Sequence, residues 1–382
     1  MKLTVSRGDL WRGIDTVLDA VPSKPALPIL SNMLLRAEDD VLFLAATNMD
    51  LSMRTRIPAT ITESGSMTVP ARTFAEIVRE WPQEGLSIEV QGDRLSLSGV
   101  QGAADSREGT YTLPGVPPDE FPEMPMLVEG LNLQNVDSRL LSSMINKTAF
   151  AVSRDETRPV LNGVLWSIDA EGMEMVATDG HRLARFRCTQ DLTEDVGGAT
   201  AEVILPPQAC NLLTKVLGSQ HGQVHATVGE SQVLFDLGET HLLSRLIEGP
   251  YVDYRQVIPS QNDKVMRVSC GDLLPAVRRV SILSSSYTHQ IRVGLTANRL
   301  ELSAASQEIG GEAREAIAAA YDHEPMEMAY NAVYLMEILR KIDAPEISFR
   351  LNNAVTAALL RPAEETEGED YFCLLMPLRL GN

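Results

Sequence analysis

The octapeptide TDGHRLAR at residues 178–185 places an acid, a histidine and two arginines close together. Asp179 and His181 are residue types of a Ser-His-Asp hydrolase, and Ser153 could supply the nucleophile. No G-x-S-x-G turn surrounds that serine, and closeness of Asp and His in sequence says little about triad geometry. The other interpretations are a tight turn between two strands, with Asp179 and Gly180 as turn residues, or part of a binding pocket.

Other signatures of catalysis or metal binding are missing from the sequence. It has no G-x-x-x-x-G-K-[ST] phosphate loop and no H-E-x-x-H helix. The 4 cysteines lie far apart and the 6 histidines form no ligand pattern, so we interpret the cysteines as small buried hydrophobes in a reducing compartment. The sequence therefore predicts a protein that is not an enzyme and that uses no metal and no cofactor.

Length and composition set the remaining bounds. A chain of 382 residues with 44% hydrophobic and 22% charged residues is expected to fold into two or three domains. The start lacks the long apolar core of a signal peptide, and no stretch is apolar for the ~18 residues that a membrane helix needs. We therefore expect a cytoplasmic protein without a membrane partner. The net charge of -19, taken alone, argues against nucleic acid.

An internal repeat gives the domain organisation. Segments that begin at Lys2, Leu131 and Lys264 share an alternating strand, a polar turn and an amphipathic helix. The first and third carry the S-x-x-D capping pattern, at Ser6 and Ser269. Each segment is followed by a second amphipathic helix, within VPARTFAEIVREW, ILPPQACNLLTKVL and MAYNAVYLMEILRKI. The repeat thus predicts three similar domains with two helices each.

Alternating runs with Gly, Asn and Asp at their turns fill the rest of each repeat and predict antiparallel sheets with one wet face. The expected class is α+β, with two helices packed on antiparallel sheets in each domain. Proline-rich stretches at 113–126 and 248–260 close the first two repeats. We predict domains at 1–125, 126–258 and 259–382.

Six motifs carry a resemblance to a known family. They are LPILSNMLL (27–35), VPAR (69–72), TRPVLNG (157–163), ATDGHRLA (177–184), DYRQVIP (253–259) and MPLRL (376–380). In this order and spacing they resemble the bacterial sliding clamp family, the β subunit of DNA polymerase III, over essentially the whole chain. The resemblance implies a non-catalytic processivity factor built of three clamp domains. Two chains would form a ring of six domains that encircles duplex DNA without sequence preference and tethers the polymerase catalytic subunit.

The resemblance also implies a hydrophobic pocket between domains 2 and 3. It would receive short motifs of the polymerase catalytic subunit, the clamp loader and other clamp-motif proteins of repair and replication control. The pocket residues would be Leu161, Thr178, Gly180, His181, Arg182, Leu183, Val252, Gln256, Val257, Val355, Leu374, Met376, Pro377, Leu378 and Arg379. Val252 replaces a common proline, Gln256 a common arginine and Ala357 a small hydroxyl residue, so the polar side of the pocket is expected to differ.

A ring holds DNA by topology, so weak phosphate contacts suffice and the charge of the hole matters more than the total charge. The expected DNA-contacting residues are basic positions of the repeated helices and of two loops: Lys24, Arg72, Arg79, Arg139, Lys147, Arg154, Lys215, Arg278, Arg279, Arg340 and Lys341. Beside Arg154, this chain has Asp155 where the family has a glutamine. The alternative is that these cations are only the solvated faces of amphipathic helices.

Ring closure would pair a strand of the first domain with the third domain of the partner chain. Ile282 and Leu283 match apolar interface positions of the family, whereas Glu108 and Thr110 stand where the family is often apolar. A homodimer is still expected, with a rearranged or salt-bridged contact, because an unpaired buried charge is costly. The rival to a clamp is a scaffold that keeps the pocket but encircles nothing.

Overall fold

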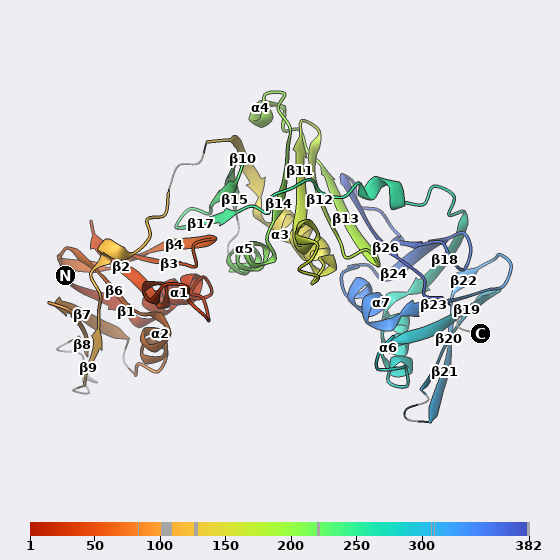
Figure 1. Ribbon diagram of the computed structural model, residues 1–382, viewed down its shortest axis with the longest axis horizontal. Helices are drawn as coiled ribbons and strands as arrows, with labels where there is room; N and C mark the ends of the chain where they lie inside the picture. The colour runs from red at the N-terminus through yellow and green to blue at the C-terminus, as the bar shows by residue number, and fades with distance from the viewer. Residues whose placement is uncertain are drawn as a thin grey trace. The chain divides into compact units, whose positions relative to one another are not determined.

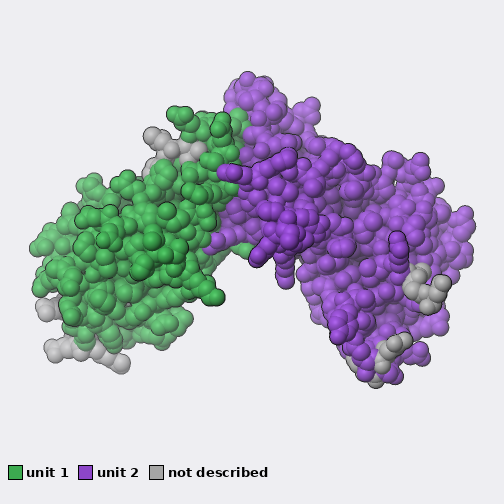
Figure 2. Space-filling model, viewed as in Figure 1, with its two compact units in different colours: residues 1–139, 211–246 green, residues 140–210, 247–382 purple. Residues whose placement is uncertain are grey.

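The computed structural model describes residues 1–82, 84–100, 109–125, 129–219, 222–306, 308 and 310–379 of the chain (Figure 1). It divides into two compact units (Figure 2). Unit 1 contains residues 1–139 and 211–246, and unit 2 contains residues 140–210 and 247–382. The described strands pair antiparallel, as the alternating runs predict.

Unit 1 contains two antiparallel sheets. The eight-stranded sheet has the order β10 (Leu131–Asp137), β15 (Gln223–Val228), β16 (Gln232–Asp236), β17 (Thr240–Arg245), β4 (Leu51–Pro58), β3 (Val41–Thr47), β2 (Asn32–Glu38) and β6 (Gly65–Pro70). The five-stranded sheet has the order β5 (Thr60–Glu63), β1 (Lys2–Ser6), β7 (Gly85–Gln91), β8 (Arg94–Gly99) and β9 (Thr110–Pro114).

Two helices of unit 1 follow the predicted pattern, α1 (Arg7–Leu18) and α2 (Ala71–Arg79). The Ser6 hydroxyl accepts the Asp9 amide 3.0 Å away, so the predicted N-cap of α1 is confirmed. The apolar stripe of α1 is buried at Leu10, Ile14 and Val17. The short 3-10 turns η1 (Pro28–Ser31) and η2 (Pro118–Glu120) complete the unit.

Unit 2 also contains two sheets. The nine-stranded sheet has the order β14 (Ala201–Leu205), β11 (Val164–Asp169), β12 (Gly172–Thr178), β13 (Arg182–Thr189), β26 (Glu369–Leu375), β25 (Ala358–Pro362), β24 (Glu346–Leu351), β18 (Lys264–Ser269) and β22 (Ala320–Tyr321). The four-stranded sheet has the order β21 (Gly311–Ala318), β20 (Arg299–Ser306), β19 (Gln290–Thr296) and β23 (Met326–Asn331).

The helices of unit 2 again match the repeat. In α6 (Cys270–Ser281) the Ser269 hydroxyl accepts the Asp272 amide, and α7 (Ala332–Leu339) is capped by Asn331. The short turns are α4 (Thr193–Val196), η3 (Ala149–Ala151), η4 (Pro159–Asn162) and η5 (Tyr254–Val257). The sequence pattern does not predict α4, because four residues are too few to show an amphipathic stripe.

The division into units falls inside α3 (Ser138–Thr148) and α5 (Pro207–Ser219), the two helices of the middle repeat. It differs from the predicted boundaries because β17 pairs with β4, from Thr240↔Thr55 to Ser244↔Leu51, and so joins strands of the middle repeat to the first. The three domains at 1–125, 126–258 and 259–382 stay a prediction. No helix within the described ranges is long and apolar enough to cross a membrane.

Candidate binding surfaces

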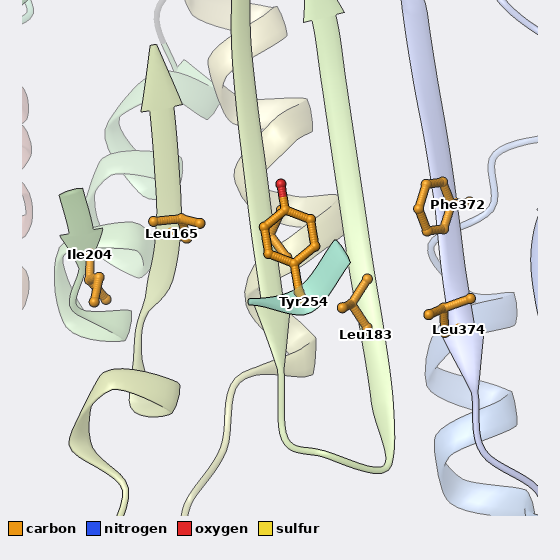
Figure 3. Packing of buried hydrophobic residues seen from close by; sticks show 7 residues of the cluster. Leu165, Leu183, Ile204, Tyr254, Phe372 and Leu374 are labelled. Carbon is orange, nitrogen blue, oxygen red and sulfur yellow. The ribbon is translucent and has the colours of Figure 1, made fainter. Parts of the chain in front are cut away.

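A buried apolar cluster in unit 2 lies across β11, β12, β13 and β26, and it includes two predicted pocket residues, Leu183 and Leu374. We call it the Tyr254 cluster; its members are Leu165, Val176, Leu183, Ile204, Tyr254, Phe372 and Leu374. Figure 3 shows the Tyr254 ring between the strands that carry Leu165 and Leu183, with Phe372 and Leu374 on the strand next to that of Leu183. Leu183 and Leu374 stand opposite each other in the β13–β26 pairing. The two stretches of chain that make up unit 2, residues 140–210 and 247–382, thus contribute side chains to one apolar cluster.

The octapeptide forms the turn between β12 and β13. The Asp179 carboxylate accepts the amides of His181 and Arg182 at 2.9 and 3.0 Å, and the Thr178 hydroxyl accepts the Gly180 amide at 3.1 Å. Gly180 has φ +90, a left-handed conformation that glycine adopts without strain. The turn interpretation is therefore confirmed. His181 is exposed at its tip, and its carbonyl accepts the Met376 amide at 2.9 Å, which ties the turn to the C-terminal segment.

Arg182 is buried, and each nitrogen of its guanidinium group has a partner. Its side chain is only 8% exposed; Nε donates to Asp179 at 3.1 Å, Nη2 donates to the Phe150 carbonyl at 2.9 Å, and Nη1 pairs with Glu337 of α7. The guanidinium also lies 4.4 Å from the centre of the Tyr334 ring. Because each of the three nitrogens has a partner, Arg182 holds the turn against α7.

A second arginine of the octapeptide joins a buried polar network beneath the Tyr254 cluster. Arg185 pairs with Glu174 and with Asp370, each at 2.6 Å, and the Tyr254 hydroxyl donates to the buried Glu174. Burial, followed by that hydrogen bond and the Glu174 charge, raises the pKa of Tyr254 well above its usual range. The network fixes the Tyr254 ring over the sheet. Sequence reasoning missed Tyr254 and Glu174, although DYRQVIP was a usable signal for the tyrosine.

The remaining predicted pocket residues divide by exposure. Val257 and Val355 are 57% and 75% exposed, and Val252 and Met376 are also exposed. Val355 lies in the β24–β25 hairpin loop, just before Ala358, which stands opposite Leu375 on β26. Exposed apolar side chains around a buried apolar layer are what a ligand surface needs.

Most of the other predicted pocket residues are less exposed, or make contacts within the chain. Leu161 is buried, Pro377 and Leu378 are half-buried, and Arg379 is exposed. The Leu378 amide donates to the Ala329 carbonyl at 2.7 Å, so the C-terminal segment runs along β23. Gln256 donates to Asp253 at 2.9 Å instead of extending a cation.

Several predicted DNA-contacting cations are neutralised by acids. Lys215 binds Asp19 at 2.8 Å and Asp15 at 3.2 Å within unit 1. In unit 2, Arg279 binds Glu315 through two nitrogens, and Lys147 lies 3.8 Å from Glu369.

In unit 1, Arg79 pairs with Glu80, and Arg72 donates weakly to the Val21 carbonyl. Across the described ranges the predicted cations whose side chains make no ion pair are Lys24, Arg72, Arg139, Arg154, Arg278, Arg340 and Lys341.

Thr110, Ile282 and Leu283, three of the predicted dimer residues, lie on or near strands that are outermost in their sheets among the described residues. Ile282 is 70% exposed after α6, and a Cβ at Gly311 on β21 would meet Leu283 at 3.2 Å. β21 is an edge of the four-stranded sheet and β9, which begins at Thr110, is an edge of the five-stranded sheet. Glu108 lies outside the described residues. Unpaired edges with an exposed apolar residue alongside are templates for pairing with another chain.

Within the described residues no group of three or more His, Cys, Asp or Glu side chains is arranged to hold a metal ion. The candidate site consists of the buried Tyr254 cluster, the exposed side chains of Val252, Val257, Val355 and Met376, and the ion pairs of Arg182 and Arg185. Repeated two-helix units on antiparallel sheets define a clamp-type α+β protein.

Comparisons with known proteins agree with this class. Family models for the N-terminal, central and C-terminal domains of the DNA polymerase III beta subunit match residues 1–125, 135–253 and 255–379. The beta sliding clamp of Caulobacter vibrioides is 34% identical over 386 residues, and that of Bacillus subtilis is 30% identical over 391 residues, in each case across 99% or more of both chains.

Solved structures give the same answer. The sliding clamp of Bartonella birtlesii bound to griselimycin has a TM-score of 0.91 and that of Bacillus subtilis 0.90, each 30% identical over 100% of both chains. The chain therefore belongs to the DNA polymerase III beta subunit family, the sliding clamps. It is a non-catalytic processivity subunit, in agreement with the sequence prediction.

Proposed function

We propose that two copies of this chain close into a ring that encircles duplex DNA, slides along it without sequence preference and tethers the replicative polymerase. The family match over all three domains is the observation that carries this proposal. Free edges at β9 and β21, with exposed Ile282 beside β21, supply the surfaces that a head-to-tail dimer would pair. The protein would work in the cytoplasm with the chromosome.

DNA contact would be weak and electrostatic. Arg278 and Arg340 make no ion pair in the part of the chain that the structure describes, and Arg279 shares its charge with Glu315. A closed ring needs no tight phosphate binding, and partial neutralisation lowers the barrier to sliding. The net charge of -19 is compatible with this proposal if the acidic residues that produce it lie away from the DNA-contacting positions.

The exposed residues above the Tyr254 cluster would form the peptide-binding pocket. Val257, Val355 and Met376 would receive apolar side chains of partner motifs, and the flexible Met376 would repack for different partners. The partners would be the polymerase catalytic subunit, the clamp loader and clamp-motif proteins of repair and replication control. Gln256, bound to Asp253, would make this pocket less selective for acidic residues than one with an arginine.

A charge-neutralised variant tests the two halves of the proposal separately. Arg278→Gln, Arg279→Gln and Arg340→Gln in one chain should reduce retention on loaded circular DNA and leave binding of a peptide from the polymerase catalytic subunit unchanged. The matched control combines Arg267→Gln on β18 with Arg292→Gln and Arg299→Gln on β19 and β20, which gives the same change in net charge and leaves the edge strand β21 unaltered.

Unchanged DNA retention in the first variant would favour the scaffold, which binds peptides but encircles nothing. Equal loss in both variants would show that only total charge matters. Conversely, Met376→Ser with Val257→Ser should weaken the peptide and leave DNA retention intact, because these exposed residues belong to the proposed pocket alone.

A further inference from the structure

A groove of about 530 Å³ lies on the eight-stranded sheet of unit 1, and none of the predicted pocket, DNA-contacting or dimer residues lines it. One wall is the sheet face that carries Arg36, Phe43 and Arg54; the other is the segment after β9, with Asp119, Phe121 and Glu123. In Figure 1 this segment includes η2, drawn in gold beside β2. We call it the Arg54 groove. Its size is that of an ordinary ligand site.

The sheet pairing explains why the two arginines share one face. A Cβ at Gly13 of α1 would meet Leu44 and Ile57, so these residues of β3 and β4 face α1. Side chains alternate along a strand, so Phe43 and Arg54 point to the opposite face. Arg36 stands directly opposite Phe43 in the β2–β3 register.

Arg36 and Arg54 thus lie on the same sheet face as Phe43, and the Arg54 guanidinium stacks on its ring. The Arg54 guanidinium lies 4.2 Å from the centre of the Phe43 ring, within cation–π range. Neither Arg36 nor Arg54 makes an ion pair within the residues that the structure describes. Their neighbour Arg56 differs, because two of its nitrogens bind the Glu239 carboxylate.

Burial and two neighbouring arginines disfavour the charge of Arg54. Burial lowers the pKa of Arg54, the charges of Arg36 and Arg56 lower it further, and only Glu38 opposes them. An incoming anion would remove this penalty. Half-buried guanidinium groups are suited to carboxylates, which they bind through parallel hydrogen bonds.

The floor and the far wall of the groove determine which other chemical groups the ligand can carry. Phe121 packs on Ile29 and Leu30, with Leu34 and Ala45 beside it, and gives an apolar floor next to the Phe43 ring. Asp119 and Glu123 face the arginines across the groove. Two acids in the wall disfavour a nucleic acid backbone, but they can accept peptide amides.

We propose that the Arg54 groove is a second docking site, for an extended acidic segment of a partner protein in which Asp or Glu adjoins an aromatic or aliphatic residue. The carboxylate binds Arg54 and Arg36, the apolar side chain lies on Phe43 and Phe121, and main-chain amides face Asp119 and Glu123. This site uses no residue of the proposed peptide pocket and does not depend on it.

The test uses the full chain and a fluorescein-labelled peptide, Gly-Asp-Phe-Glu-Leu-Gly, with blocked ends. Fluorescence anisotropy should show saturable binding that Arg54→Met weakens about tenfold and Arg36→Met by less, because a charge-assisted hydrogen bond is lost. The matched control is Arg94→Met, an exposed arginine of unit 1 outside the groove with the same charge change. It should leave binding unchanged.

A second probe replaces Asp and Glu of the peptide by Asn and Gln, and should bind about tenfold more weakly to the unmodified chain. Arg54→Lys keeps the charge but not the fork, so an intermediate affinity supports the geometry and covers the case in which Arg54→Met fails to fold. The proposal is overturned by absence of saturable binding, by equal loss with Arg94→Met, or by displacement with inorganic phosphate at constant ionic strength.

Discussion

Arg54 in unit 1 and Arg182 in unit 2 stack on aromatic rings at similar distances, 4.2 Å from Phe43 and 4.4 Å from Tyr334. Beyond the ring they differ. Arg182 is buried and binds Asp179 and Glu337, whereas Arg54 is half-buried and makes no ion pair within the described residues. The same stacked pair is therefore structural in one place and available to a ligand in the other.

What separates the two cases is the supply of acid by distant parts of the chain. Glu337 reaches Arg182 from α7, and Asp179 is held in place by the turn it closes. At Arg54 the residues directly opposite on the neighbouring strands are Ala45 and His241, and neither is an acid. Glu239 binds Arg56 instead. Stability and binding thus depend on how many partners each guanidinium already has.

The largest expected effect is on stability. Arg182→Met should lower the free energy of unfolding of unit 2 by about 3–5 kcal/mol, because it leaves the nearly buried Asp179 without its partner. Arg54→Met should change the unfolding of unit 1 by about 0.5 kcal/mol or less, since it breaks no ion pair. Urea titration measures both.

Tryptophan fluorescence can follow unit 2 alone. Trp166 is fully buried in β11, and a background with Trp11→Phe and Trp81→Phe removes the tryptophans of unit 1. The reciprocal background, Trp166→Phe, keeps Trp11 and Trp81 and follows unit 1 for Arg54→Met. Similar losses of stability for Arg182→Met and Arg54→Met would contradict the distinction between the two arginines.

A smaller loss is expected at the other end of the Arg182 contacts. Glu337→Gln should lower the free energy of unfolding of unit 2 by about 1 kcal/mol, because Glu337 is 34% exposed and solvent screens its pairing. Glu327→Gln, which removes the exposed pair with Arg292, should change it by less than about 0.5 kcal/mol. The reverse order would show that burial does not set the strength of these pairs.

The aromatic partners should separate binding from stability. Tyr334→Leu should cost unit 2 about 0.5–1 kcal/mol of unfolding free energy. Phe43→Leu should weaken the acidic peptide at the Arg54 groove by a few-fold, with little change in unfolding of unit 1. Anisotropy and urea titrations on both variants measure the four values, and a stability loss confined to Phe43→Leu would reverse the comparison.

The smallest effect concerns His241, opposite Arg54 on β17. Burial chiefly lowers its pKa, Arg54 and Arg56 lower it further, and Asp236 opposes them. Arg54→Met should therefore raise the pKa of His241 toward its usual value in an NMR titration. Arg36→Met should leave it in place. A lower pKa in the first variant would contradict this electrostatic description.

The same shift gives a pH dependence. Because the folded pKa of His241 lies below its unfolded value, the unfolded chain binds more protons between the two, and stability falls as the pH drops through that window. Arg54→Met should bring the folded pKa of His241 closer to its unfolded value, and so narrow the pH range over which stability falls. Urea titrations from pH 7 to pH 5 measure the change.

Local sequence was enough for the parts of the fold that depend on local contacts. The caps at Ser6 and Ser269 and the stripe of Leu10, Ile14 and Val17 can be read from spacing alone, because each involves residues within two turns of one helix. The β17–β4 pairing could not be predicted, since it joins Thr240 to Thr55 across the repeats.

The sites show the same limit. The family resemblance named Leu183 and Leu374, which stand opposite each other in the β13–β26 pairing, but it did not name Tyr254, whose ring packs in the same cluster. The state of an arginine depends on partners far along the chain, such as Glu337 for Arg182 and Glu239 for Arg56. The Arg54 groove was missed for this reason as well.

The central claim is that this chain holds DNA by encircling it. The direct measurement loads the protein onto circular DNA, raises the salt concentration and compares retention before and after one restriction cut. A topological link predicts retention on the intact circle at high salt and loss from the cut molecule, because electrostatic binding alone falls with salt on both. Equal loss from the circle and the cut DNA would contradict the clamp.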